Sequence, residues 1–265
     1  MKYWRYYIAT IILFAAFLRL LGIWHGYPFS YYGDEAHFVK RALSFGSGDL
    51  NPHWFHKPAF FMYILFVEYG VYFVLGKIFG LWSSVEEFAV SFVHNPGPFY
   101  LIGRITVTAF SIATIWTVYL IGEKHIKKGA GLVGAIFLAL SYAHVAGSQD
   151  VKADIPATFF TIISVYFLLN YIDNQKQKNL LLAVVMAGMG TAVKYYPLVM
   201  LAPIVFGITI VNGRTFNEIL QNWQRIVLIS VGSILLLYTV FFICSPYNFI
   251  DPLGFNQTFG RMIEA

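Results

Sequence analysis

The sequence predicts an all-α polytopic membrane protein, and its composition is the first reason. Hydrophobic residues make up 58% of the 265 residues, whereas charged residues make up 12%. A soluble domain carries about 25% charged residues, so most of this surface must face lipid. The second reason is a series of apolar runs, most of them near the roughly 20 residues that a helix needs to cross a bilayer. They occupy residues 6–23, 59–80, 98–121, 129–147, 155–172, 179–193, 197–212 and 226–244.

The connectors between these runs set their direction across the membrane. Basic residues are concentrated in 123–128, 173–178 and 213–225, and at the N-terminus in Lys2 and Arg5. Cytoplasmic loops carry an excess of lysine and arginine, so we expect all four segments in the cytoplasm. This distribution also explains the net charge of +5 without a basic stripe for nucleic acid, and we expect no nucleic-acid partner.

The number of crossings gives a parity constraint. Three apolar runs separate the N-terminus from 123–128, an odd number, although both ends are expected in the cytoplasm. The run 59–80 is the one that should not span, because it contains Glu68 and Lys77 among many aromatic residues. Aromatic rings with a few charges suit the membrane interface. We therefore expect residues 24–97 to form an external loop with interfacial helices, which leaves about seven spanning helices.

This topology brings three polar segments to one external face, namely residues 31–58, the connector 148–154 and Lys194. Ionisable groups beside lipid are kept where they face water, a partner or a substrate. If 59–80 spanned the membrane, the first segment would lie opposite the other two, and a shared site would be impossible.

Asp34 follows Gly33 and precedes an amphipathic stretch, which allows two interpretations. It could cap a helix, as aspartate often does, or act as a general base whose strength rises when it is partly desolvated near lipid. Glu35 points elsewhere on a helix, where it could ligate a metal, orient an acceptor or cap. The letters DEAH at 34–37 also occur in helicases, but no phosphate-binding GxxxxGK[ST] loop accompanies them.

Cationic groups come later in the same segment. His53 and His56 are spaced by three residues and could bind a metal or make ordinary interfacial contacts. Lys57 precedes Pro58, and a lysine at the headgroup level can hold a phosphate or extend toward lipid headgroups. The same two alternatives apply to Lys194.

Two further charged residues are candidates, Asp154 at the end of the 148–154 connector and Arg104 in the run 98–121. Asp154 begins a helix at Ile155-Pro156, so capping competes with a functional role. Arg104 lies inside a spanning run, where an arginine needs a partner. Glu68 and a lipid phosphate are the candidate partners.

Three stretches of this sequence resemble a known family. Residues 33–63, GDEAHFVKRALSFGSGDLNPHWFHKPAFFMY, resemble the first external loop of the GT-C membrane glycosyltransferases, which shows a DE pair, then GD, then KP opening a helix. Residues 103–160 resemble the family's arginine-bearing helix, basic turn and second acidic loop, and 188–203 its glycine-rich helix with a terminal lysine. The likeness is closest to the branch with protein O-mannosyltransferases and the lipid A aminoarabinose transferase.

The resemblance implies a single GT-C-like module over 1–265 that moves a sugar from a polyprenyl-phosphate donor to an acceptor hydroxyl, with inversion. Asp34 matches the catalytic aspartate, Lys57 the phosphate-contacting lysine, Asp154 the second acidic residue and Lys194 a lysine of the later helix. Because the leaving group is already a phosphate, one carboxylate and two lysines are a sufficient catalytic set.

Further candidates complete the predicted site. Glu35 is a second catalytic candidate, and His56 and Arg104 are added to the substrate-binding candidates. A divalent metal, Mg²⁺ or Mn²⁺, is an open question, with Asp34, Glu35 and Asp154 as its candidate ligands.

The expected partners are the lipid-linked donor, membrane lipids and an acceptor protein, lipid or glycan. The expected location is a prokaryotic plasma membrane with the active site facing outward. Family members usually continue well beyond 265 residues, so a C-terminal part that carries acceptor recognition is expected to be missing. The alternatives are a transporter or flippase of a lipid-linked substrate and an inactive membrane scaffold, but no internal repeat supports a transporter.

Overall fold

The computed structural model describes residues 2–30 and 33–263, which contain helices and no strand. Residues 31 and 32, at the start of the first polar segment, lie outside the described residues. The helices are α1 (Lys2–Leu21), α2 (Gly33–Ser44), α3 (Phe60–Ile78), α4 (Val85–His94), α5 (Gly97–Ile121), α6 (Ala130–Leu140), α7 (Tyr142–Gly147), α8 (Asp154–Asn174), α9 (Gln177–Val193), α10 (Leu201–Asn212), α11 (Phe216–Cys244), α12 (Tyr247–Ile250) and α13 (Pro252–Ile263).

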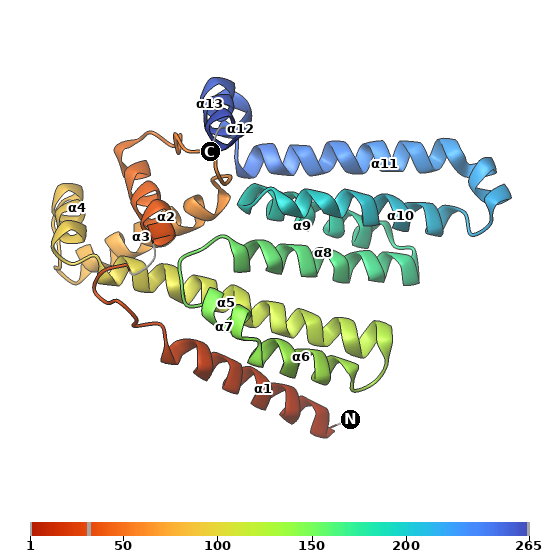
Figure 1. The fold of residues 1–265 in the computed structure, drawn as a ribbon, viewed down its shortest axis with the longest axis horizontal. Coiled ribbons are helices and arrows are strands. Elements are labelled where there is room, and N and C mark those ends of the chain that lie inside the picture. The colour runs from red at the N-terminus through yellow and green to blue at the C-terminus, as the bar shows by residue number, and fades with distance from the viewer. Residues whose placement is uncertain (1, 31–32, 264–265) are drawn as a thin grey trace.

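A bundle of apolar helices forms the body of the protein. Helices α1, α5, α6, α8, α9, α10 and α11 run side by side, whereas α2, α3, α4, α12 and α13 gather at one end (Figure 1). Within the described residues, this arrangement confirms the predicted membrane bundle of about seven helices with extra helices in the loop that follows the first.

The length of helix α3 suggests that it spans the membrane, whereas its position suggests that it does not. By length and apolar composition alone, Phe60–Ile78 could cross a membrane, as could Gly97–Ile126, Asp154–Asn174 and Phe216–Cys244. However, α3 packs mainly on α2 and lies with it at the end of the bundle (Figure 1). This position supports the interfacial assignment of 59–80.

The two ends of the bundle differ in the loops they carry. The N-terminus and the turns α5–α6, α8–α9 and α10–α11 lie at one end, which we call the basic end (Figure 1). There, His125 Nδ1 lies 2.8 Å from Asp173 Oδ2, and Lys124 donates to Asn170. The opposite end, which we call the site end, holds α2, the start of α8 and the end of α9 (Figure 1). The three polar segments therefore share one end, as the parity argument predicts.

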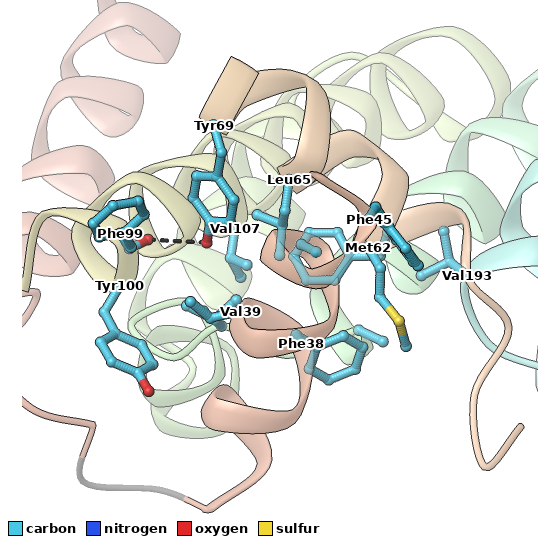
Figure 2. Packing of buried hydrophobic residues seen from close by; sticks show 14 of the residues in the cluster. Phe38, Val39, Phe45, Met62, Leu65, Tyr69, Phe99, Tyr100, Val107 and Val193 are labelled. Atoms are coloured by element: carbon cyan, nitrogen blue, oxygen red, sulfur yellow. Dashed lines mark hydrogen bonds between the residues drawn. The ribbon is translucent and has the colours of Figure 1, made fainter. Parts of the chain in front are cut away.

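Helix α2 is oriented by an apolar stripe. Its buried residues Glu35, Phe38, Val39 and Ala42 follow the i, i+3, i+4, i+7 spacing of one helix face. The apolar members join a buried cluster with residues of α3, α5 and α9, seen in Figure 2. Since Asp34 precedes this stripe by one position, it remains on the exposed side of α2.

The apolar run 129–147 is divided into α6 and α7. A buried arginine stabilises the backbone where the two helices meet. Arg19 of α1 donates to the carbonyl oxygens of Leu138 (3.4 Å) and Ala139 (3.3 Å), and to His144 Nδ1 (2.9 Å). The last carbonyls of a helix have no partner within the helix, so Arg19 satisfies two of them and fixes α1 against the end of α6.

Candidate active site

Asp34 and Lys57 form an ion pair at the site end. Asp34 lies in the first turn of α2, and its Oδ2 is 3.4 Å from Nζ of Lys57. The ammonium lies 5.3 Å from the ring centroid of Phe38 and 5.9 Å from that of Trp54, a geometry in which rings attract a cation. A carboxylate next to an ammonium group can accept a proton, which is what a general base requires.

The two members of this pair differ in exposure. The side chain of Asp34 is 56% exposed, whereas that of Lys57 is 17% exposed. Because α2 turns the Asp34 side chain away from the protein core, desolvation of Asp34 has to come from lipid or from a bound substrate, and it stays a prediction.

Asp154 and Lys194 form a second ion pair at the same end. Asp154 is the first residue of α8, and its Oδ1 accepts from Nζ of Lys194, the residue directly after α9. The N-cap of α8 is Ala153, which provides no side-chain hydrogen bond. The capping alternative for Asp154 is therefore wrong, and its carboxylate is available to Lys194.

A hydrogen bond joins the segments that carry the two pairs. The hydroxyl of Tyr195 donates to the carbonyl oxygen of Phe55 over 2.8 Å. Tyr195 follows Lys194 in the chain, and Phe55 precedes Lys57 by two residues. The structure therefore brings the loop after α2 against the end of α9, so both lysines belong to adjoining segments.

Glu35 and Arg104 form a third pair, which is fully buried. Arg104 Nε and Nη2 donate to the two carboxylate oxygens of Glu35, each over 2.9 Å. The backbone N–H of Val151 donates to Glu35 Oε1 over 3.0 Å. Arg104 Nη1 donates to the carbonyl oxygens of Ile23 (2.8 Å) and His25 (2.7 Å). One pair thus connects α2, α5, the segment after α1 and the 148–154 connector.

This pair corrects the roles predicted for its members. The candidate partners of Arg104, Glu68 and a lipid phosphate, are wrong, because Glu35 binds the guanidinium on two atoms. Neither Glu35 nor Arg104 is exposed to solvent, so a catalytic Glu35 and a substrate-binding Arg104 do not fit this geometry. Both residues position the site end instead.

A group that the sequence analysis did not identify lies beside this pair. His25 Nε2 is 2.9 Å from Asp150 Oδ1, and Lys152 Nζ is 2.8 Å from Asp150 Oδ2. Ligand atoms of His25, Glu35 and Asp150 lie within 4.8 Å of one another, a spacing that could suit a metal ion. However, Arg104 and Lys152 already balance the two carboxylates, so the group does not fit a divalent cation.

The predicted metal ligands do not converge either. Glu35 is turned into the protein, whereas the carboxylates of Asp34 and Asp154 each contact a lysine. A divalent cation would have to compete with those ammonium groups. These carboxylates therefore do not fit a site for Mg²⁺ or Mn²⁺ in the described structure.

Trp54 organises the cationic side of the site. The His37 ring stacks on it at 5.4 Å and 14°, and the guanidinium carbon of Arg41 lies 4.7 Å from its centroid. The His56 ring, a predicted substrate contact, lies 5.3 Å away. Burial lowers the pKa of Arg41 from its usual value. A tryptophan between two histidines, His53 and His56, is the sequence signal that could have indicated this cluster.

The metal alternative for the histidine pair is not supported. His53 Nε2 lies 2.8 Å from Asp49 Oδ2, and His56 packs on Trp54. The two rings are therefore engaged with different neighbours within the described part of the loop.

Comparison with known families identifies the helical bundle. The model of the dolichyl-phosphate-mannose-protein mannosyltransferase family matches residues 101–244, from the second turn of α5 to the end of α11. No curated protein matches the chain. No solved structure matches it. The match covers more than half of the 265 residues and includes Arg104, Asp154 and Lys194. We conclude that the chain belongs to the dolichyl-phosphate-mannose-protein mannosyltransferase family and is a membrane glycosyltransferase of the GT-C type.

Proposed function

We propose that this protein transfers a sugar from a polyprenyl-phosphate donor to an acceptor hydroxyl, with inversion, at the site end of its helical bundle. The observation that carries the proposal is a set of two ion pairs, Asp34 with Lys57 and Asp154 with Lys194, on segments that the Tyr195–Phe55 hydrogen bond joins. A base and two phosphate-binding cations are the groups that this reaction requires.

The reaction uses these groups as follows. The Asp34 carboxylate accepts the proton of the acceptor hydroxyl while that oxygen attacks the anomeric carbon. The bond between the anomeric carbon and the phosphate oxygen breaks, and its electron pair leaves with the polyprenyl phosphate. Lys57 and Lys194 stabilise the charge that develops there, and Asp154 positions Lys194.

The charge of the phosphate changes during this step, which favours catalysis. The donor is a phosphodiester with one negative charge, whereas the departing polyprenyl phosphate gains a second. Lysines near it therefore bind the transition state more tightly than the donor, and only such differential binding accelerates a reaction. Asp34 forms an ion pair with Lys57. When the donor phosphate binds Lys57 in its place, the Asp34 carboxylate becomes available to accept a proton.

The orientation and partners belong to the same proposal. The lysine-rich and arginine-rich loops lie at the basic end, which by the positive-inside rule faces the cytoplasm. The site end then faces outward from a plasma membrane. The acceptor hydroxyl belongs to a protein, a lipid or a glycan.

The test compares two exposed aspartates of one loop. Asp34→Asn removes the base, whereas Asp49→Asn removes a carboxylate that contacts His53 and is equally exposed, at 56%. Transfer from a radiolabelled polyprenyl-phosphate sugar should fall about 100-fold or more in Asp34→Asn, the usual contribution of a general base. Donor binding should persist, and Asp49→Asn should behave as the unmodified protein.

Unchanged transfer by Asp34→Asn would overturn the assignment of Asp34 as the base. Transfer that falls equally in both variants would show a general effect of the loop and would also count against it.

A further inference from the structure

A cavity of about 690 Å³ lies between α2, α3 and α4. It borders the buried cluster of Figure 2 and shares Tyr69 and Phe88 with it. Its lining is dominated by aromatic and aliphatic side chains, including Phe66, Phe73 and Phe92. Pockets that bind small molecules have volumes of roughly 300–1,000 Å³, so this cavity is large enough for a ligand or part of one.

Gly70 keeps the cavity open on the α3 side. A Cβ atom built on Gly70 would meet no atom within 4 Å, and Gly70 lines the cavity. Glycine is unfavourable inside a helix, and no close backbone contact requires it at this position. The missing side chain thus adds to the open space above α3.

The mouth of the cavity carries one charge of each sign. Lys40 on α2 and Glu86 in the first turn of α4 both line it, and both are exposed. Neither belongs to an ion pair among the residues that the structure describes. A ligand with both a negative and a positive group would complement this pair.

The surface around the cavity is suited to lipid. Helices α3 and α4 expose a series of aliphatic side chains next to the lining residues. They are Val67, Val71, Val74, Ile78, Val90 and Val93. An exposed apolar surface of this kind marks contact with a membrane or a partner.

The cavity is separate from the proposed active site. Lys57 lies over Phe38 of α2, whereas the cavity is lined by Lys40. Two residues apart on a helix means about 200° of rotation, so the two sites lie on different sides of α2.

We propose that this cavity binds one acyl chain of a zwitterionic phospholipid, with the headgroup phosphate at Lys40 and the headgroup ammonium at Glu86. The apolar lining accepts the chain, and the two charges at the mouth select the headgroup. A polyprenyl phosphate or an anionic phospholipid offers no ammonium group to Glu86, so its carboxylate stays without a cationic partner beside an anionic ligand, which disfavours both.

The test measures lipid retained by the full chain. Protein is reconstituted in nanodiscs containing palmitoyl-oleoyl phosphatidylethanolamine and phosphatidylglycerol, released into detergent, and analysed by native mass spectrometry. The unmodified chain should retain one phosphatidylethanolamine. Gly70→Leu fills the cavity and should lower that retention about tenfold, because each excluded methylene loses apolar burial.

A matched control variant exists on α11. Gly232 is also an exposed helical glycine with no atom within 4 Å of an added Cβ, and Gly232→Leu should retain the lipid. Glu86→Gln, a surface change, should reduce the preference for phosphatidylethanolamine over phosphatidylglycerol about fivefold, in the range of an exposed ion pair.

Three results would overturn the proposal. The first is equal retention by the unmodified chain and Gly70→Leu. The second is preferential retention of phosphatidylglycerol, or of added undecaprenyl phosphate, over phosphatidylethanolamine. The third is a preference that Glu86→Gln leaves unchanged, which remains measurable if Gly70→Leu does not fold.

Discussion

Two adjacent carboxylates show how position on a helix decides the role of a residue. Successive residues on a helix are about 100° apart, so Asp34 and Glu35 face different surroundings. Asp34 is exposed beside Lys57, whereas Glu35 is buried against Arg104. The same acidic pair therefore provides one exposed group, which we propose for chemistry, and one buried group for structure.

The first residue-scale prediction concerns stability. Glu35→Gln leaves the buried Arg104 without its charge partner, and removal of one member of a buried ion pair costs about 3–5 kcal/mol. Asp34→Asn is the matched change on the same helix, and an exposed pair is worth about 0–1 kcal/mol. Thermal unfolding in detergent should therefore show a large loss for Glu35→Gln and a small one for Asp34→Asn.

Together with the transfer assay, these two variants distinguish the proposed catalytic role of Asp34 from the structural role of Glu35. Asp34→Asn should lose transfer and keep its stability, whereas Glu35→Gln should lose stability first. Equal stability of the two variants would contradict the structural role of the Glu35–Arg104 pair.

At the scale of elements, the membrane topology depends on whether α3 spans the bilayer. Phe60–Ile78 is long and apolar enough to span a membrane, yet it lies with α2 at the site end. If it spanned, Lys77 near its end would lie on the side of the α5–α6 turn. If it is interfacial, Lys77 lies on the side of Asp49.

Accessible cysteines test this assignment. Single cysteines replace Asp49, Lys77 and Lys127 in a chain whose own Cys244 is changed to Ser. A membrane-impermeant maleimide should label positions 49 and 77 in intact cells, and position 127 only after permeabilisation. Labelling of position 77 only after permeabilisation would show that α3 spans.

At the scale of the whole molecule, the sequence predicts what depends on apolar length and charge. The run 59–80 corresponds to α3, and 226–244 to the later part of α11. The alternation of basic and acidic connectors also predicts that Asp34, Asp154 and Lys194 share one end. The apolar length of a segment and the charge of its connectors decide how that segment sits in the bilayer, whatever the other segments do, so both can be predicted from the sequence.

Features that depend on packing could not be predicted in this way. Glu35 and Arg104 are 69 residues apart, and their contact exists only because α2 lies across α5. The run 129–147 contains no residue that marks its break, which Arg19 of α1 stabilises from another helix. None of the predicted apolar runs extends beyond residue 244, yet the chain forms α12 and α13 there.

The central claim is that three distant polar segments form one site for a polyprenyl phosphate. The most direct measurement is photoaffinity labelling with a polyprenyl-phosphate analogue that carries a diazirine beside the phosphate, followed by peptide mass spectrometry. Peptides around Lys57 and Lys194 should be labelled in the same sample, and excess unlabelled donor should suppress this labelling. The 123–128 turn should not be labelled. Labelling of only one of the two peptides, or of the 123–128 turn, would contradict the central claim.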